Sequence, residues 1–263
     1  MTLVWRPGIL YDADALAYME LVKAADAAAG QTGGLEPGVV DAINDFVVGC
    51  KTDGIWDAIK ASCILAGART LNGALIPLAG TAPTNVNFVS GDYNRKTGLK
   101  GDGTTKYLNS NRNNNADPQN NCHLAIYKND SDVESNPYWI GSASSGFSVI
   151  NGIGRNGAYS NSNGSIVNTN SSAGLHGVSR SDGASAVLKR PSLSALSSSL
   201  NSTTPPTVAN FIYTINGNGT PFAGNWSAAR LAFYSIGESL DLAALDTRVT
   251  ALITAFQAPG VIP

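Results

Sequence analysis

The residues with the clearest capacity for chemistry are the alternating acids Asp130, Asp132 and Glu134. Alternating carboxylates on one strand can flank a glycosidic bond, and converging carboxylate oxygens can bind a hard cation such as Ca²⁺. The run is rich in turn-forming residues, and Ser135 and Gly141 replace the glycine and the closing acid of a calcium loop. We therefore expect a solvated loop with no catalytic role and no metal, and these acids are the metal candidates if a site exists.

The segment from Gly152 to Gly157 matches the spacing G-x-G-x-x-G of dinucleotide-binding loops. That motif works only where it opens a helix whose N-terminus faces the pyrophosphate. The residues that follow, Ala158 to Asn163, are rich in Ser and Asn and do not favour a helix. The pattern instead predicts a hairpin turn with glycines at positive φ, and we expect no cofactor.

The two histidines and three cysteines do not form a recognisable site. Cys122 and His123 are adjacent, so in a strand their side chains point to opposite faces and do not share a metal. His176 has no neighbouring nucleophile or acid in a catalytic arrangement. Cys50, Cys63 and Cys122 lie in apolar patterns and indicate buried, reduced thiols.

Aromatic side chains offer a second kind of site. Tyr138, Trp139 and Trp226, with Tyr159, lie among Asn residues that would surround an exposed ring. Sugar C–H groups stack on such rings while their hydroxyls take hydrogen bonds. The competing interpretation is that Trp139 and Trp226 fill the core of the domain.

Composition excludes several classes of protein. The chain of 263 residues has a net charge of -2, and only 14% of its residues are charged. Without a basic run we expect no nucleic-acid partner, and without an apolar stretch of about 18 residues we expect no membrane insertion. The sequence shows no secretory signal pattern, which predicts folding in a reducing cytosol. The abundant Asn and Ser favour turns and exposed loops.

Residues 1–36 are predicted to form a separable arm. Asp12 is placed to cap a helix that runs to about Ala29, and Gly30 to Gly34 would form a hinge. This arm is expected to dock on other subunits. The residues predicted to make these assembly contacts are Trp5, Leu16, Met19 and Val22.

Residues 37–84 are predicted to form a helical hairpin and a connector. Apolar spacing indicates one helix over Val39 to Val48 and another over Ile55 to Ala66, with Asp53 capping the second. The buried faces of both helices need a larger partner. We expect this pair to pack on the domain that follows.

Residues 85–240 change to short apolar runs separated by Gly, Asn, Ser and Pro. This spacing predicts an antiparallel β-sandwich or jelly roll, with 192–206 as a long polar loop. A closing helix and tail follow over 241–263, capped by Ser239, with an apolar seam from Leu242 to Phe256 that should pack on the sandwich. The predicted strands lie at 86–89, 107–109, 122–127, 138–140, 147–153, 166–167, 175–178, 186–188, 208–215 and 231–236.

Several segments together resemble a known family. The helical AINDFVVGCKTDGIWDAIKA, the strand pair LKGDGTTKYL, the segment GLHGVSRSDGASAVLKR and the ending FAGNWSAARLAFYSIGESLDLAALDTRV are similar to concanavalin A-like, or laminin-G-like, jelly-roll domain proteins of tailed bacteriophages and prophages. Their order covers roughly residues 39 to 256. The resemblance implies a concanavalin A-like sandwich in a virion structural protein, and the wider superfamily binds or cleaves carbohydrate.

We therefore expect a non-enzymatic bacteriophage virion surface protein, made in the host cytoplasm. It would be a fibre, an adhesin or a capsid-decorating subunit that assembles through its N-terminal arm and displays a lectin-like sandwich. Its expected partners are other virion structural proteins, further copies of itself and, for host attachment, a surface glycan. The alternative is a carbohydrate-binding or carbohydrate-cleaving module. The sequence leaves capsid or tail location, the glycan and the stoichiometry open.

Overall fold

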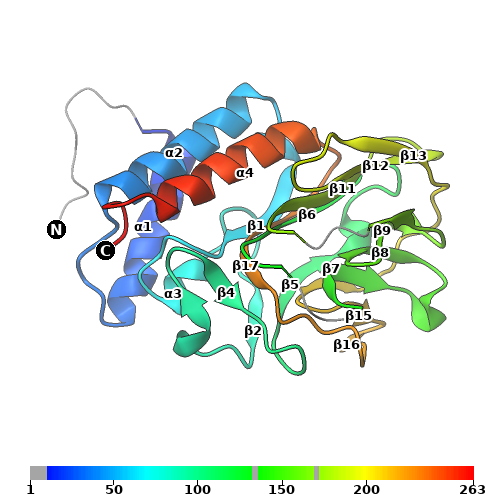
Figure 1. Cartoon of the computed structure of the whole chain (residues 1–263), viewed down its shortest axis with the longest axis horizontal. Coiled ribbons are helices and arrows are strands. Elements are labelled where there is room, and N and C mark those ends of the chain that lie inside the picture. Colours follow the sequence, from blue (N-terminus) through cyan, green and yellow to red (C-terminus); the bar gives the residue numbers. More distant parts are fainter. Residues whose placement is uncertain (1–10, 132–135, 169–171) are drawn as a thin grey trace.

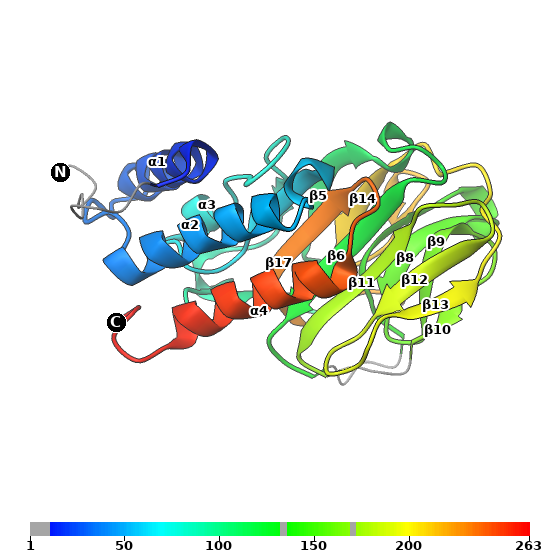
Figure 2. The same ribbon diagram turned by 90° about the horizontal axis from the view of Figure 1, so that it is seen from above.

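The computed structural model describes residues 11–131, 136–168 and 172–263 and has three layers (Figure 1). Within those ranges, three long helices form one outer layer, and two antiparallel β-sheets of eight and nine strands form the others. The predictions of a mainly β sandwich and of a C-terminal helix are confirmed at this level. An N-terminal helix pair is also present, but it is formed by α1 (Ala13–Ala28) and α2 (Pro37–Thr52) and not by the two helices predicted within residues 37–84. Helices α2 and α4 (Leu242–Gln257) lie side by side over the eight-stranded sheet, and α1 lies next to α2, as seen from above in Figure 2.

The eight-stranded sheet, sheet A, has β17 near its centre. Its order is β13-β12-β11-β6-β17-β4-β3, and β1 also pairs with β17. The N-terminal strand β1 and the last strand therefore lie next to each other. The strands are β1 Ile59–Ile64, β3 Tyr93–Asn94, β4 Gly98–Lys100, β6 Cys122–Lys128, β11 Gly174–Arg180, β12 Ser185–Lys189, β13 Leu196–Ser199 and β17 Arg230–Gly237.

The nine-stranded sheet, sheet B, packs against the inner face of sheet A. Its order is β10-β9-β8-β7-β14-β5-β2, and the hairpin of β15 and β16 joins it through β7. All ten predicted strand regions contain strand in the two sheets. The strands of sheet B are β2 Thr84–Val86, β5 Tyr107–Asn113, β7 Tyr138–Ala143, β8 Ile150–Gly154, β9 Gly157–Ser162, β10 Ile166–Val167, β14 Ala209–Ile212, β15 Asn216–Gly217 and β16 Thr220–Pro221.

The predicted helix over Ile55 to Ala66 is wrong, because this segment forms β1 after a short 3₁₀ turn. The helix was predicted because apolar residues at positions 55, 56, 59 and 63 recur at helical spacing. Within β1 itself, Ile59, Ala61 and Cys63 alternate with Lys60 and Ser62, which is the pattern of a strand. The sandwich consequently begins at β1 rather than at residue 85. The predicted polar loop 192–206 is also partly wrong, since it contains the edge strand β13.

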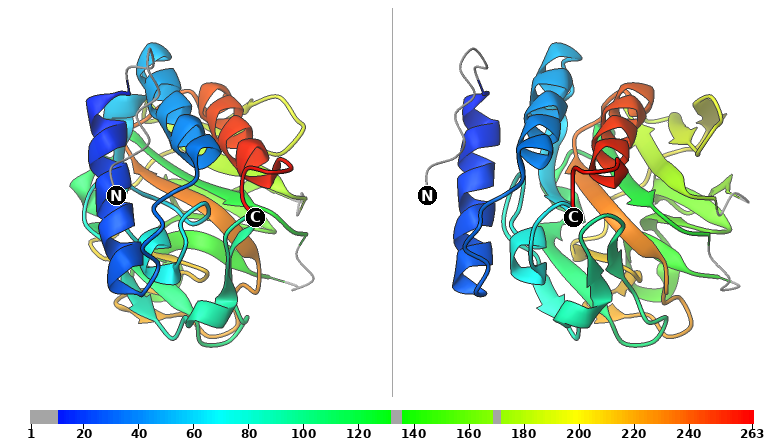
Figure 3. Two further views of the ribbon diagram at one scale, coloured as in Figure 1. Left: turned by 90° about the vertical axis from the view of Figure 1, so that its left-hand side faces the viewer. Right: turned by 60° about the vertical axis from the view of Figure 1, so that its left-hand side comes forward.

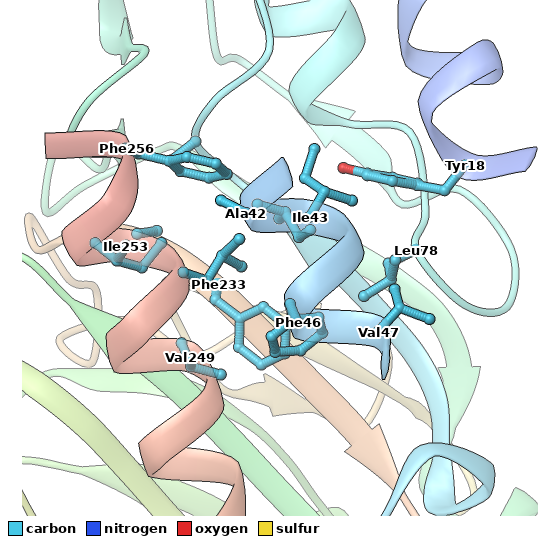
Figure 4. Packing of buried hydrophobic residues seen from close by; sticks show 14 of the residues in the cluster. Tyr18, Ala42, Ile43, Phe46, Val47, Leu78, Phe233, Val249, Ile253 and Phe256 are labelled. Atoms are coloured by element: carbon cyan, nitrogen blue, oxygen red, sulfur yellow. The ribbon is translucent and has the colours of Figure 1, made fainter. Parts of the chain in front are cut away.

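Two apolar cores hold the layers together. The core between the sheets contains Leu231, Tyr234 and Ile236 of β17, whereas Phe233 of the same strand joins the core under the helices. In Figure 4 the Phe233 ring lies beside Phe46 of α2, and the ring centroids are 5.7 Å apart. β17 is therefore buried on both faces.

Helices α2, Pro37–Thr52, and α4, Leu242–Gln257, cover sheet A. The predicted apolar seam of α4 is confirmed, because its residues Leu242, Leu245, Val249, Leu252 and Phe256 are all buried. Asp241 caps this helix, with its carboxylate accepting from two backbone N–H groups, so the prediction that Ser239 is the cap is wrong. Asp53 does not cap a following helix either; it ends α2 and pairs with Arg248 at 2.7 Å.

Helix α1, Ala13–Ala28, begins at Asp12 as predicted, but it is not a separable arm. Met19 and Val22 are each 1% exposed and lie in the helical core of their own molecule, with Leu16 packed against it. In this fold they are not available for contacts with other subunits. The fourth predicted assembly residue, Trp5, lies outside the described residues.

The carboxylate of Asp26 fixes the end of α1 to the rest of the molecule. It accepts hydrogen bonds from the backbone N–H of Arg69 at 2.9 Å, and from the backbone N–H and hydroxyl of Thr70 at 2.9 and 2.7 Å. Thr70 in turn caps the short helix α3, Leu71–Ala74. Asp26 is 1% exposed, so these bonds are shielded from water. They replace the free hinge predicted after this helix.

Part of the Asn and Ser content lies in the interior rather than on exposed loops. Asn114 donates from its side-chain amide to Asn161 at 2.7 Å and accepts from Asn151. The guanidinium of Arg180, 1% exposed, donates to the carbonyls of Ser160 and Leu200. Buried polar groups need such partners to offset their desolvation. One end of the sandwich is consequently held by hydrogen bonds as well as by apolar packing.

Replacing Asp26 with alanine should lower the free energy of unfolding by about 3 kcal/mol, because three buried donors lose their acceptor. Urea unfolding monitored by circular dichroism measures the change. The matched control is Glu20→Ala in the same helix, where the carboxylate is exposed and pairs only with Lys23; it should cost less than about 0.5 kcal/mol. Equal effects of the two substitutions would contradict this role for Asp26.

Candidate functional site

Aromatic side chains cross the outer face of sheet B, the face turned away from sheet A. Tyr159 of β9 pairs with Gly152 of β8, and Gly152 pairs in turn with Gly141 of β7. Gly141 also pairs with Phe211 of β14 on its other side. Directly paired residues point to the same face of a sheet. The row therefore places an aromatic residue at each end and two glycines between them.

Tyr138 adds a second ring beside Tyr159. Tyr138 pairs with Gly154 of β8. Gly154 is two residues from Gly152 on the same strand, so Tyr138 also lies on the outer face of sheet B. The ring centroids of Tyr138 and Tyr159 are 6.2 Å apart with 30° between the planes. Both tyrosines are half-buried. Together they form a partly exposed platform.

The glycines of this face allow close approach of the rings and the backbone. A Cβ at Gly154 would lie 2.5 Å from the carbonyl oxygen of Pro137, and one at Gly152 would lie 3.3 Å from Cδ1 of Tyr138. Gly152, Gly154 and Gly157 all have negative or extended φ. The predicted hairpin is therefore confirmed between β8 and β9, but the expectation of positive φ at these glycines is wrong.

A second aromatic group lies at the other end of the same face. Tyr107 of β5 packs on Phe211 with ring centroids 4.7 Å apart, and on Trp226 with centroids 6.0 Å apart. Phe211 is buried, whereas Tyr107 and Trp226 are half-buried. We call the residues Tyr107, Tyr138, Tyr159, Phe211 and Trp226 the aromatic face. Since the helical layer covers sheet A, this face lies on the opposite side of the sandwich (Figure 3).

The structure separates the three predicted ligand-binding aromatics. Tyr138 and Trp226 lie on the aromatic face, but Trp139 is fully buried between the sheets. Adjacent strand residues point to opposite faces, and a bulge between Tyr138 and Ile140 leaves both Trp139 and Ile140 in the core between the sheets. Tyr107 and Phe211 were not selected from the sequence. Their alternation with the inward-facing Leu108 and Ile212 is the signal that identifies their side of the sheet.

Trp139 contacts two buried basic side chains. Its ring lies 4.4 Å from that of His176, and Nζ of Lys128 lies 4.1 Å from the ring centroid. His176 Nε2 donates to the carbonyl oxygen of Ser172 at 3.0 Å. Burial, together with the nearby cations, lowers the pKa of His176 to about 3. The imidazole is therefore neutral and has a structural role.

Of the three predicted acidic candidates, only Asp130 lies within the described residues. The Asp130 carboxylate accepts from the Lys100 ammonium and from the backbone N–H of Arg230 at 2.8 Å, so it anchors the end of β17. Asp132 and Glu134 lie outside the described residues. In the described parts of the chain no three His, Cys, Asp or Glu side chains gather as metal ligands.

His123 and the cysteines are buried in the interior. His123 Nδ1 donates to the carbonyl of Glu238, and its Nε2 accepts from the Ser235 hydroxyl at 2.7 Å. Burial lowers the pKa of His123 to about 4. The prediction of buried free thiols is confirmed, and burial raises the pKa of Cys122 to about 11, so this thiol is protonated and unreactive near neutral pH.

Comparisons with known proteins give no relative for this chain. No family model matches the sequence, and the searches of curated proteins and of solved structures gave no match. None of the helices in the described ranges has the length and apolar character needed to cross a membrane.

Acidification should destabilise the fold through its two histidines. Both pKa values are depressed in the folded state, so between the ordinary value of 6.5 and the folded value only the unfolded chain binds the proton. The stability contributed by each neutral imidazole is complete above pH 6.5 and is lost as the pH falls below it. Between pH 7 and 5 the expected loss is about 2 kcal/mol per histidine.

Urea unfolding at pH 7, 6 and 5 measures this dependence, in a range where most carboxylates stay ionised. His123→Gln can donate to Glu238 and accept from Ser235 without titrating, so it should remove about half of the slope. An unchanged slope in this variant would contradict the assignment to His123.

Proposed function

We propose that the chain is a non-enzymatic surface protein of a bacteriophage virion, with a concanavalin A-like jelly-roll sandwich as its displayed domain. The observation that carries the proposal is the asymmetry of the sandwich. One side is covered by the helices α1, α2 and α4, and the other side presents the aromatic face. A displayed domain needs one side for attachment and one for contact with the surroundings.

The segments that resemble the phage family lie together in the fold and support this proposal. The first quoted segment forms most of α2 and leads into β1, and the last contains β17 and the first half of α4. β17 pairs with β1, and α2 packs against α4. These segments are therefore one structural unit, although about 170 residues separate β1 from β17 in the sequence.

The proposed attachment differs from a long N-terminal arm. Because Met19 and Val22 are buried in their own molecule, α1 belongs to the body of the protein. Assembly as a fibre, an adhesin or a capsid-decorating subunit would then use the outer surface of the helical layer. Other virion proteins and further copies of the chain are the proposed partners, and the virion is the proposed location.

A second candidate function is carbohydrate binding, and the aromatic face favours it. Half-buried Tyr138, Tyr159 and Trp226 offer ring faces for sugar C–H groups. Near Tyr138, the amide of Asn156 donates to that of Asn136 at 2.9 Å, and Asn225 donates to the Asn136 carbonyl at 2.9 Å. These amides supply polar groups at the rim. A host-surface glycan is the proposed ligand, and cleavage would require a carboxylate pair that includes Glu134.

The virion location is tested by immunogold electron microscopy. Antibodies raised against the purified chain should label intact particles produced by a host that carries its gene. Antibodies first adsorbed with the purified chain serve as the control. Label confined to soluble cell fractions, with bare particles, would contradict the virion proposal.

The carbohydrate proposal is tested on a glycan array and on purified host polysaccharide. Tyr159→Ala and Trp226→Ala should each weaken binding about tenfold, since one stacked ring contributes on the order of 1 kcal/mol. The matched control is Trp56→Ala, which removes a half-buried ring on the helical side. Binding that all three variants retain equally would eliminate the aromatic face as the glycan site.

A further inference from the structure

A groove of about 500 Å³ runs between α2 and α4 on the outer surface of the helical layer. Phe46 and Leu252, each 2% exposed, form its apolar floor. Val48 stands on the rim and is 41% exposed, and Asp45 lies exposed beside it. The remaining lining residues are Ala42, Gly49, Thr52, Arg248, Ala251 and Ala255.

Small residues keep this groove open. Ala42 and Gly49 on α2 face Ala251 and Ala255 on α4, so no large side chain fills the space between the helices. A Cβ at Gly49 would lie 2.7 Å from Cδ of Arg248, which shows how closely the arginine crosses the helix there. The result is an apolar channel with a charged rim.

The described chain begins next to this groove. The hydroxyl of Tyr11 donates to Asp41 of α2 at 2.9 Å, and the backbone N–H of Asp12 donates to Asn44 at 2.8 Å. Asp41 and Asn44 directly adjoin the groove residues Ala42 and Asp45 in the sequence of α2. The described chain therefore starts beside the same helix that forms one wall of the groove.

We propose that residues 1–10, MTLVWRPGIL, bind in the groove between α2 and α4 of their own molecule. A helix with its side chains is about 10 Å across, and an extended residue spans about 3.3 Å. Residues 7–10 are therefore long enough to cross α2. That leaves the apolar Leu3, Val4 and Trp5 for the groove, with Arg6 next to the Asp45 carboxylate.

Attachment in the same chain favours this occupant over a separate molecule. A short tether keeps the segment at an effective concentration in the millimolar range, so a modest apolar contact is enough to fill the groove. The inference is independent of the virion proposal. It assigns Trp5 a contact within its own molecule.

A disulfide trap tests the contact in the full chain. Val4→Cys is combined with Val48→Cys on the rim of the groove, and the rate of disulfide formation under mild oxidation is measured on non-reducing gels. The matched control combines Val4→Cys with Leu196→Cys on β13, which is 45% exposed and lies at the far end of the molecule (Figure 2). The three native cysteines are buried, so they do not compete.

The proposal predicts that the Val48 pair closes within one chain at least tenfold faster than the Leu196 pair. Adding Ala251→Glu, which places a charge in the groove at an exposed position, should reduce that rate toward the control. Equal rates for the two pairs would overturn the proposal. A covalent dimer as the main product of the Val48 pair would also overturn it, because the occupant would then come from a second copy.

Discussion

The structure depends on the burial of β17 on both of its faces. Phe233 needs the helical layer, and Leu231, Tyr234 and Ile236 need sheet B. A strand with two apolar faces is stable only when a layer covers each face. The three-layer arrangement follows from this single strand, since α2 and α4 supply one cover, sheet B supplies the other, and β1 and β6 satisfy its backbone on either side.

The sequence was sufficient to predict most elements but not all of their types. Short apolar runs between Gly, Asn and Ser located the strands, and Asp12 and the apolar spacing located α1, α2 and α4. β1 was misread because Ala61 and Cys63 face the sheet core while Ile59 and Ile64 face the helices. Ile55, Trp56, Ile59 and Cys63 also recur at helical spacing, and the pairing of β1 with β17 shows which of the two structures this segment forms.

The site was harder to predict because it depends on local irregularities and on tertiary contacts. Adjacent strand residues point to opposite faces, so Tyr138 and Trp139 could not both be exposed. The bulge that places Trp139 and Ile140 together in the core has no signal in the sequence. The attachment of α1 to the rest of the molecule depends on Asp26. An acidic residue in an Ala-rich helix is expected to be exposed to solvent, but this one is buried. The Asp26 carboxylate is buried because it accepts hydrogen bonds from the backbone N–H groups of Arg69 and Thr70, which lie more than 40 residues later in the sequence.

The position of β17 also constrains the order in which the chain can fold during synthesis. β1, β4 and β6 are translated early, but each has β17 as a hydrogen-bonded neighbour. Until β17, Arg230–Gly237, leaves the ribosome, these strands have unpaired edges, which invite pairing with other chains. Sheet A therefore completes only after β17 has been synthesised, and premature termination before residue 230 removes the strand that joins its two halves.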